Sequence, residues 1–108
     1  MNIEQVGADS WQQWVANNDA VLIDVREPYE WQQTGVLPDA KLISMGELPV
    51  SLDQLAQDTP ILVVCRTGNR SQHAAAWLES HGYRAANLAG GVVQRGGGDQ
   101  DVVALAGF

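Results

Sequence analysis

The only cysteine of this 108-residue chain, Cys65, lies among residues that suit a reactive thiolate. It follows the apolar run 61–64 directly and precedes a polar loop that carries Arg66 and Arg70. These are two of only six lysine and arginine residues in a chain of net charge −7, so the cluster indicates an anionic ligand. Nearby cations and inward-turned backbone N–H groups favour the thiolate. The alternative is a cysteine that serves only packing, but the polar residues that follow at once place Cys65 at a strand end.

A buried strand and a helix are predicted on either side of this loop. Residues 61–64 are apolar and mostly β-branched, which is typical of a strand buried on both faces. Residues 71–81 have a helical pattern that ends at Gly82. Such a strand directs Cys65 to the carboxyl edge of a sheet, where open α/β sheets bind ligands, and the helix start adds unpaired N–H groups.

The rest of the chain alternates further strands and helices. Strands are predicted at residues 3–6, 21–25, 41–44 and 84–88. Helices are predicted at residues 7–16, 27–35 and 51–57, with a loop over residues 45–50. The spacing of Ser51 and Gln54 fits a capping box at the start of the last of these helices. This alternation predicts right-handed βαβ crossovers and a mostly parallel sheet with helices on both faces.

Composition and length favour one globular domain and exclude several classes of function. We expect a single domain over residues 1–95. A glycine-rich tail over residues 96–108 then either docks on the body or moves freely. The sequence has no run of about 18 apolar residues that would predict a membrane span. It also has no basic and apolar leader that would predict secretion. The acidic balance, with a pI near 4.4, argues against nucleic acid as a partner.

Cysteine and histidine usage bears on compartment and metals. One cysteine cannot form an internal disulfide, which favours a reducing cytoplasm. With only two distant histidines beside it, a structural zinc site is not expected. We expect neither a metal nor a cofactor.

Three blocks of sequence, in order along the chain, resemble one known family. They are Leu22–Trp31, Cys65–Ser71, and Gly82-Tyr83 followed by Asn87–Gly91. The resemblance is to the rhodanese family, sulfurtransferases that carry sulfur as a cysteine persulfide, and it covers most of the chain. It implies an α/β, rhodanese-like fold with a mostly parallel sheet of about five strands and helices on both faces.

The resemblance also implies a reaction, that of a thiosulfate sulfurtransferase. The Cys65 thiolate would attack the outer sulfur of thiosulfate, release sulfite, and pass the sulfur to cyanide, a thiol or a protein acceptor. Backbone N–H groups of residues 66–71 would hold the anionic persulfide, and the two arginines would bind or steer the oxyanion. The candidate site therefore has Cys65 as the catalytic residue and, as substrate-binding residues, Arg66, Thr67, Gly68, Asn69, Arg70 and Ser71.

Asp24 and Arg26 form a second polar feature of the sequence. They alternate along a predicted strand and therefore point to one face. We interpret them as a structural pair that supports the loops at the sheet end, since thiolate attack with a good leaving group needs no general base. Residues 35–40 depart from the family pattern Gly-His-Ile-Pro-Gly-Ala, and Arg95 stands where the family has tryptophan.

Two other classes of function remain open at this point. The first is a cysteine phosphatase or an arsenate reductase. The phosphatase loop has five residues between its cysteine and its arginine, whereas only the four residues 66–69 separate Cys65 from Arg70. A non-catalytic, rhodanese-like binding or regulatory module is the other alternative. That class usually lacks the cysteine, which this chain retains.

Overall fold

The protein is an α/β sandwich built on one parallel sheet. The computed structural model describes residues 2–94, so the predicted tail 96–108 lies outside the described residues. All strand pairs are parallel, in the order β1-β5-β4-β2-β3. The strands are β1 (Glu4–Val6), β2 (Val21–Asp24), β3 (Lys41–Leu42), β4 (Ile61–Val64) and β5 (Ala85–Leu88). The α/β fold class predicted from the sequence is confirmed.

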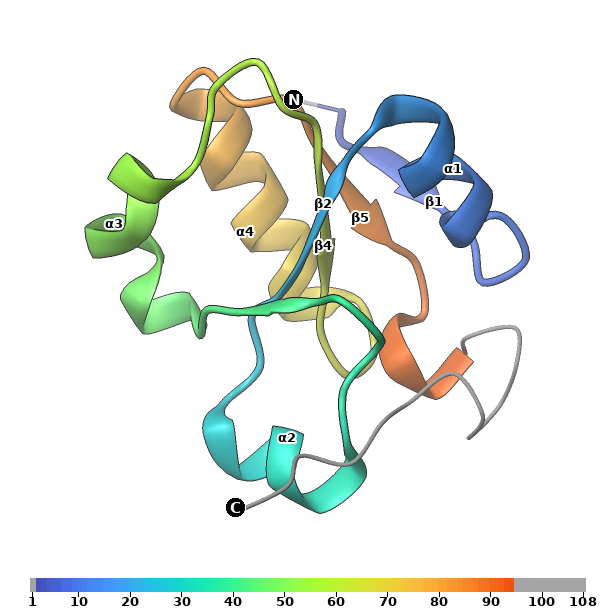
Figure 1. Ribbon diagram of the computed structural model, residues 1–108. Helices are drawn as coiled ribbons and strands as arrows, with labels where there is room; N and C mark the ends of the chain where they lie inside the picture. Colours follow the sequence, from blue (N-terminus) through green and yellow to red (C-terminus); the bar gives the residue numbers. More distant parts are fainter. Residues whose placement is uncertain (1, 95–108) are drawn as a thin grey trace.

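Helices cover both faces of this sheet. The α-helices are α1 (Trp11–Asn18), α2 (Pro28–Thr34), α3 (Leu48–Ser51) and α4 (Asn69–Ser80). Short 3-10 helices are η1 (Met45–Glu47), η2 (Leu52–Gln54) and η3 (Gly91–Gln94). Figure 1 shows α3 and α4 on one face and α1 on the other, while α2 lies beyond the ends of the central strands.

The central strand β4 contributes to both halves of the core. Ile61, Val63 and Cys65 face the cluster beneath α3 and α4, whereas Leu62 and Val64 face the cluster that includes α1 and η3. All five are at most 1% exposed. This two-sided burial explains the uninterrupted apolar run, and it fixes the register that carries Cys65 to the carboxyl end of the sheet.

The helix after the loop begins two residues earlier than the sequence predicted. Asn69, rather than Ser71, is the first residue of α4, and Gly68 precedes it with a φ of 104°. That left-handed conformation is costly for any residue with a Cβ, so glycine is the residue that lets the loop turn directly into the helix. The predicted helix end near His81 is confirmed within a residue.

The prediction for residues 45–57 is wrong. The expected loop over 45–50 contains η1 and the start of α3, and the expected helix over 51–57 is replaced by the end of α3 and the 3-10 turn η2. Pro49 lies in the first turn of α3, where its missing N–H costs nothing. The Tyr83 hydroxyl contacts the carbonyl oxygens of Leu52 and Leu55 at 3.1 and 3.3 Å, and so it satisfies acceptors that a continued helix would have paired.

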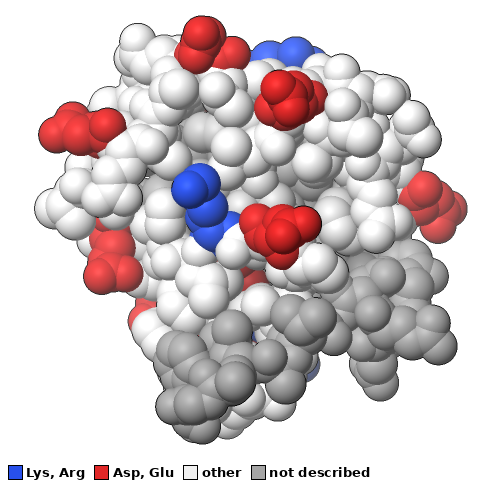
Figure 2. All heavy atoms as spheres, in the orientation of Figure 1, with Lys and Arg blue, Asp and Glu red and all other residues white. Residues whose placement is uncertain are grey.

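The face of the molecule seen in Figure 2 is mainly acidic or uncharged. Figure 2 shows acidic side chains scattered over the visible face, with few basic ones among them. Within residues 2–94, no helix is both long and apolar enough to cross a membrane. An anionic ligand would therefore have to be attracted by a local group against the field of the whole molecule.

Candidate active site

The Cys65 sulfur lies at the centre of the loop that joins β4 to α4. Only 1% of Cys65 is exposed, and the loop closes around its Sγ atom. The backbone N–H groups of Gly68 and Ser71 point at Sγ, with N···S distances of 3.1 and 3.4 Å, and Ser71 Oγ is 3.3 Å away. The loop is therefore a cradle of hydrogen-bond donors around one sulfur atom.

These donors set the protonation of the cysteine. Burial raises the pKa of the Cys65 thiol, because it disfavours the charged form. Hydrogen bonds from the Ser71 hydroxyl and from the backbone N–H groups of Ser71, Gly68 and Thr67 outweigh burial, so that the net pKa lies below its usual value. Neutral donors, more than neighbouring cations, thus favour the nucleophilic thiolate.

The 3-10 helix η3 supports the loop from the other side. The N–H groups of Val92 and Val93 donate to the carbonyl oxygens of Cys65 and Arg66, at 2.9 and 3.2 Å. Gly91 has a φ of 60°, and a Cβ there would collide with the backbone of both loop residues. The close approach therefore requires glycine at this position.

Arg70 is held by a carboxylate. Its Nη1 and Nη2 atoms lie 2.6 and 2.8 Å from the two carboxyl oxygens of Glu30, a two-point ion pair between α4 and α2. Glu30 also accepts the Glu27 N–H at 3.1 Å, in a capping box. The hydrogen bonds from Arg70 lower the pKa of Glu30 to about 2, and Glu30 in turn raises the pKa of Arg70. The charge expected to meet a substrate oxyanion is thus largely neutralised.

Arg66 has a different environment. It follows Cys65 directly, its side chain is exposed, and among residues 2–94 no carboxylate forms an ion pair with it. Thr67 and Asn69 are exposed as well, whereas Gly68 is buried. The structure therefore separates the two arginines that the sequence treated alike, and Arg66 is the one whose positive charge remains available at the loop.

Asp24 and Arg26 form a buried ion pair at the end of β2. Arg26 is 1% exposed, and its Nε and Nη2 atoms donate to both Asp24 oxygens at 2.8 to 3.1 Å. The same guanidinium donates to Thr34 Oγ1 and to the Gly35 carbonyl, each at 2.8 Å. This geometry supports the interpretation of a structural pair, because it fastens the end of β2 to the end of α2.

The altered segment 35–40 keeps a turn by other means. Asp39, which stands where the family pattern has glycine, has a φ of 64°. Aspartate tolerates this left-handed conformation better than most residues with a side chain. Val36 and Leu37 are at most 5% exposed, so apolar burial holds the part of the turn where the family pattern has histidine and isoleucine.

Asn87 belongs to the site, although sequence reasoning gave it no role. Its Oδ1 atom is 2.5 Å from Ser71 Oγ, and its Nδ2 atom donates to the Gly68 carbonyl at 3.2 Å and to Gln5 Oε1 at 2.9 Å. Asn87 is only 3% exposed. The available signal was an asparagine within the predicted strand 84–88, because a polar side chain that is buried in a sheet needs hydrogen-bond partners.

Glu30 was missed for a different reason. Its three-residue spacing from Glu27 is a recognisable capping-box signal, but that pattern indicates only a helix start. Nothing in the sequence links α2 to Arg70, which lies 40 residues further along the chain.

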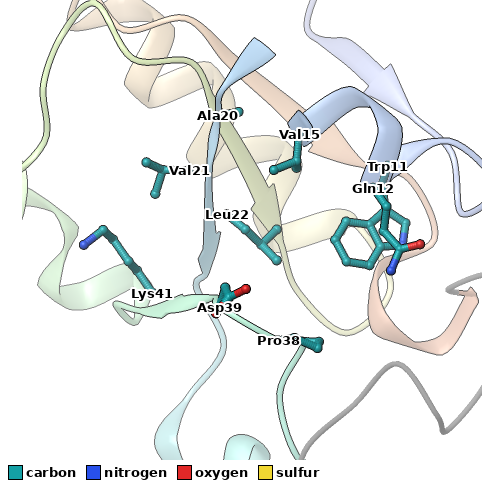
Figure 3. Close-up of a pocket in the computed structure, with 9 residues that line it drawn as sticks. All are labelled: Trp11, Gln12, Val15, Ala20, Val21, Leu22, Pro38, Asp39 and Lys41. Atoms are coloured by element: carbon teal, nitrogen blue, oxygen red, sulfur yellow. The ribbon is translucent and has the colours of Figure 1, made fainter. Parts of the chain in front are cut away.

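A separate hollow lies on the α1 side of the sheet, away from the loop. It has a volume of about 350 Å³ and lies between α1 and the first residues of β2 and β3. In Figure 3 the lining side chains do not converge, and Lys41 points away from Trp11. Among residues 2–94, no group of His, Cys, Asp and Glu side chains is placed to hold a metal ion. The donor cradle around Cys65 is therefore the site whose groups converge on one atom.

Sequence comparisons with known proteins identify the family. The rhodanese-like domain model matches residues 7–94. A sulfurtransferase of Allochromatium vinosum is 34% identical over 93 residues, which cover 84% of this chain and 86% of that protein. The putative sulfurtransferase YtwF of Bacillus subtilis is 31% identical over 94 residues, covering 86% and 90%.

Comparison with solved structures identifies the same family. A rhodanese-like domain protein from Staphylococcus aureus superimposes with a TM-score of 0.85 at 27% identity. The match covers 96% of this chain and 100% of that one. The chain belongs to the family of rhodanese-like domains.

Proposed function

We propose that the protein is a thiosulfate sulfurtransferase that carries sulfur on Cys65. The observation that carries this proposal is the set of donors around Sγ, in which Gly68 N–H, Ser71 N–H and Ser71 Oγ all lie within 3.4 Å. Such a cradle stabilises a thiolate and, after transfer, an anionic persulfide. The two relatives named as sulfurtransferases support the same chemistry.

The reaction has two displacement steps. The Cys65 thiolate attacks the outer sulfur of thiosulfate, a new S–S bond forms, and the old S–S bond breaks with its electron pair leaving on sulfite. A thiolate, cyanide or a protein thiol then attacks the outer sulfur of the persulfide. The electron pair of that S–S bond returns to Cys65, which regenerates the thiolate.

The loop fits a sulfur atom better than a phosphate. The N–H groups that a phosphatase would direct at phosphate oxygens are here directed at Sγ itself. Cysteine phosphatases close their loop around the phosphate with an arginine one position further along, where this chain has Ser71, and the nearby Arg70 is paired with Glu30. Both observations favour sulfur transfer over phosphate or arsenate chemistry.

Donor, acceptor and compartment form the finer part of the proposal. A small donor suits Cys65, which is only 1% exposed, because only a slender group can reach its sulfur. The exposed charge of Arg66 favours an anionic donor such as thiosulfate. The lone cysteine favours a reducing cytoplasm, where thiols and protein cysteines are available as acceptors.

Mass spectrometry of the intact protein tests the proposal. After incubation with thiosulfate and removal of the excess, the non-reduced protein should gain one sulfur atom and lose it on addition of cyanide or a thiol. The Cys65→Ser variant, verified as folded by circular dichroism, should gain none. A folded protein with a reactive thiol and no adduct would contradict the proposal and favour the non-catalytic binding module.

A further inference from the structure

The Ser71 hydroxyl lies between two groups that can accept its proton. Ser71 Oγ is 2.5 Å from Asn87 Oδ1 and 3.3 Å from Cys65 Sγ. A hydroxyl has one proton to donate and two lone pairs that accept. It can donate at full strength to only one of these groups at a time, and the shorter distance favours Asn87.

The orientation of the Asn87 amide is fixed by its other partners. Its Nδ2 atom donates to the Gly68 carbonyl and to Gln5 Oε1. A flipped amide would place its oxygen against the Gly68 carbonyl oxygen, two acceptors without a proton between them. Oδ1 therefore faces Ser71, where it can only accept.

We propose that Asn87 is a positioning residue that competes with the Cys65 sulfur for the Ser71 hydroxyl proton. While Cys65 is a thiol, Ser71 donates to Asn87 and offers a lone pair to the S–H group. When Cys65 releases its proton to solvent, the hydroxyl rotates about its C–O bond and donates to the thiolate. The hydrogen bond to Asn87 is lost in that step, so Asn87 favours the resting thiol and adds to the cost of forming the nucleophile.

The charged and titratable groups near Cys65 lie outside this network. They are Arg66 in the loop, Arg70 on α4 with its neighbours Tyr29 and Glu30 on α2, and Asp24 and Arg26 at the end of β2. Strand β5, which carries Asn87, has no charged residue. Uncharged substitutions at Ser71 and Asn87 therefore leave the surrounding charges as they are, and a change in Cys65 titration reports on the hydrogen bonds.

A double-mutant cycle tests the competition. The rate of Cys65 alkylation is measured against pH for the wild type, Asn87→Ala, Ser71→Ala and the double variant. Asn87→Ala should lower the pKa of Cys65 by about 0.5 to 1 unit, the scale of one neutral hydrogen bond, because the hydroxyl is released to the sulfur. The same substitution in the Ser71→Ala background should leave the pKa unchanged. A rise, or an equal shift in both backgrounds, would mean that Asn87 only holds the loop, and would overturn the proposal.

Two further variants separate competition from loosening. Asn87→Asp should raise the pKa of Cys65, since a carboxylate holds the hydroxyl proton more firmly, and the part of that rise caused by Ser71 should vanish in Ser71→Ala. Gln5→Ala removes one partner of Asn87 without touching Ser71, and should leave the pKa of Cys65 unchanged. If Gln5→Ala lowered that pKa as much as Asn87→Ala does, loosening would be the cause and the competition would be refuted.

The catalytic consequence of this inference rests on the proposed sulfur transfer, but its test does not. Alkylation titrates the thiol whether or not a persulfide forms. Coupling between Asn87 and Ser71 without a sulfur adduct would refute the proposed function alone. A sulfur adduct without coupling would refute the role of Asn87 alone.

Discussion

Two arginine–carboxylate pairs support the site, and they differ in burial. The Asp24–Arg26 pair is at most 1% exposed, and its guanidinium also satisfies Thr34 and the Gly35 carbonyl. The Glu30–Arg70 pair joins α2 to α4 at the loop; its Arg70 side chain is 39% exposed and its Glu30 side chain 10%. Both are two-point contacts with similar distances, so geometry alone does not distinguish them.

The difference in burial predicts different consequences when each pair is broken. An unpaired charge in the interior costs several kcal/mol, because water cannot replace the lost partner. A pair with one partly exposed member is screened from that side, so breaking it costs less. We therefore expect the fully buried pair to affect folding and the partly exposed Glu30–Arg70 pair to affect mainly the electrostatics of the loop.

The largest effect is expected for Arg26→Met, which leaves Asp24 buried without its partner. The free energy of unfolding should fall by about 3–5 kcal/mol. Chemical denaturation measures it, with Arg70→Met as the matched control, for which a loss of about 1 kcal/mol is expected. Equal losses in the two variants would show that burial does not separate the pairs.

A compensating variant sharpens this test. Adding Asp24→Leu to Arg26→Met removes the stranded carboxylate, so part of the stability should return. Recovery should be incomplete, since the Gly35 carbonyl, which accepts from Arg26, remains without that donor.

An intermediate effect is expected for the partly exposed Glu30–Arg70 pair in acid. The pKa of Glu30 is about 2 in the folded protein and near 4.5 in the unfolded chain. Because the folded value is the lower one, the stabilisation is present above about pH 4.5 and is lost as pH falls toward 2. Full linkage would give about 3 kcal/mol, and screening at the exposed Arg70 reduces this to about 1–2 kcal/mol.

Glu30→Gln is the control for that acid titration. Urea denaturation at several pH values between 5 and 2 should show a smaller decline in stability for the variant than for the wild type. Identical slopes would mean that folding does not lower the pKa of Glu30.

The sequence could predict the parts of the site that neighbouring residues determine, and it missed those that contacts across the chain determine. The apolar run 61–64 and the loop after it predicted a buried strand that ends at a cysteine, which is confirmed. The pairing of Arg70 with Glu30 is a contact between residues 40 positions apart, so spacing carried no sign of it. The hydrogen bond of Ser71 to Asn87 likewise joins a helix and a strand, α4 and β5, whose relative position is set only in the folded protein.

The prediction over residues 51–57 failed because a local signal was overridden by a tertiary one. Ser51 and Gln54 have capping-box spacing, yet Ser51 makes no capping hydrogen bond. Carbonyl groups in that segment instead contact the Tyr83 hydroxyl, 28 to 31 residues away. The spacing of two residues cannot predict that carbonyl oxygens of the segment will bond to a side chain from a distant part of the chain.

The smallest effect concerns substrate attraction, where the Glu30–Arg70 pair is compared with the exposed Arg66. Arg66→Ala should raise the KM for thiosulfate about fivefold, which corresponds to about 1 kcal/mol for one charge near the surface. Arg70→Ala should also raise KM, but through the uncompensated charge of Glu30 beside the loop. Adding Glu30→Ala should therefore return KM close to the wild-type value, because the intact pair is nearly neutral.

Steady-state kinetics at two ionic strengths distinguish these origins. The effect of Arg66→Ala should shrink between 0.05 and 0.5 M salt, roughly a threefold change in screening length, since it depends on an exposed charge. If the Glu30→Ala and Arg70→Ala double variant keeps the high KM of Arg70→Ala, then Arg70 contacts the donor directly, and the neutral-pair account is wrong. Recovery in the double variant would assign attraction of the donor to Arg66 and leave Arg70 as the brace between α2 and α4.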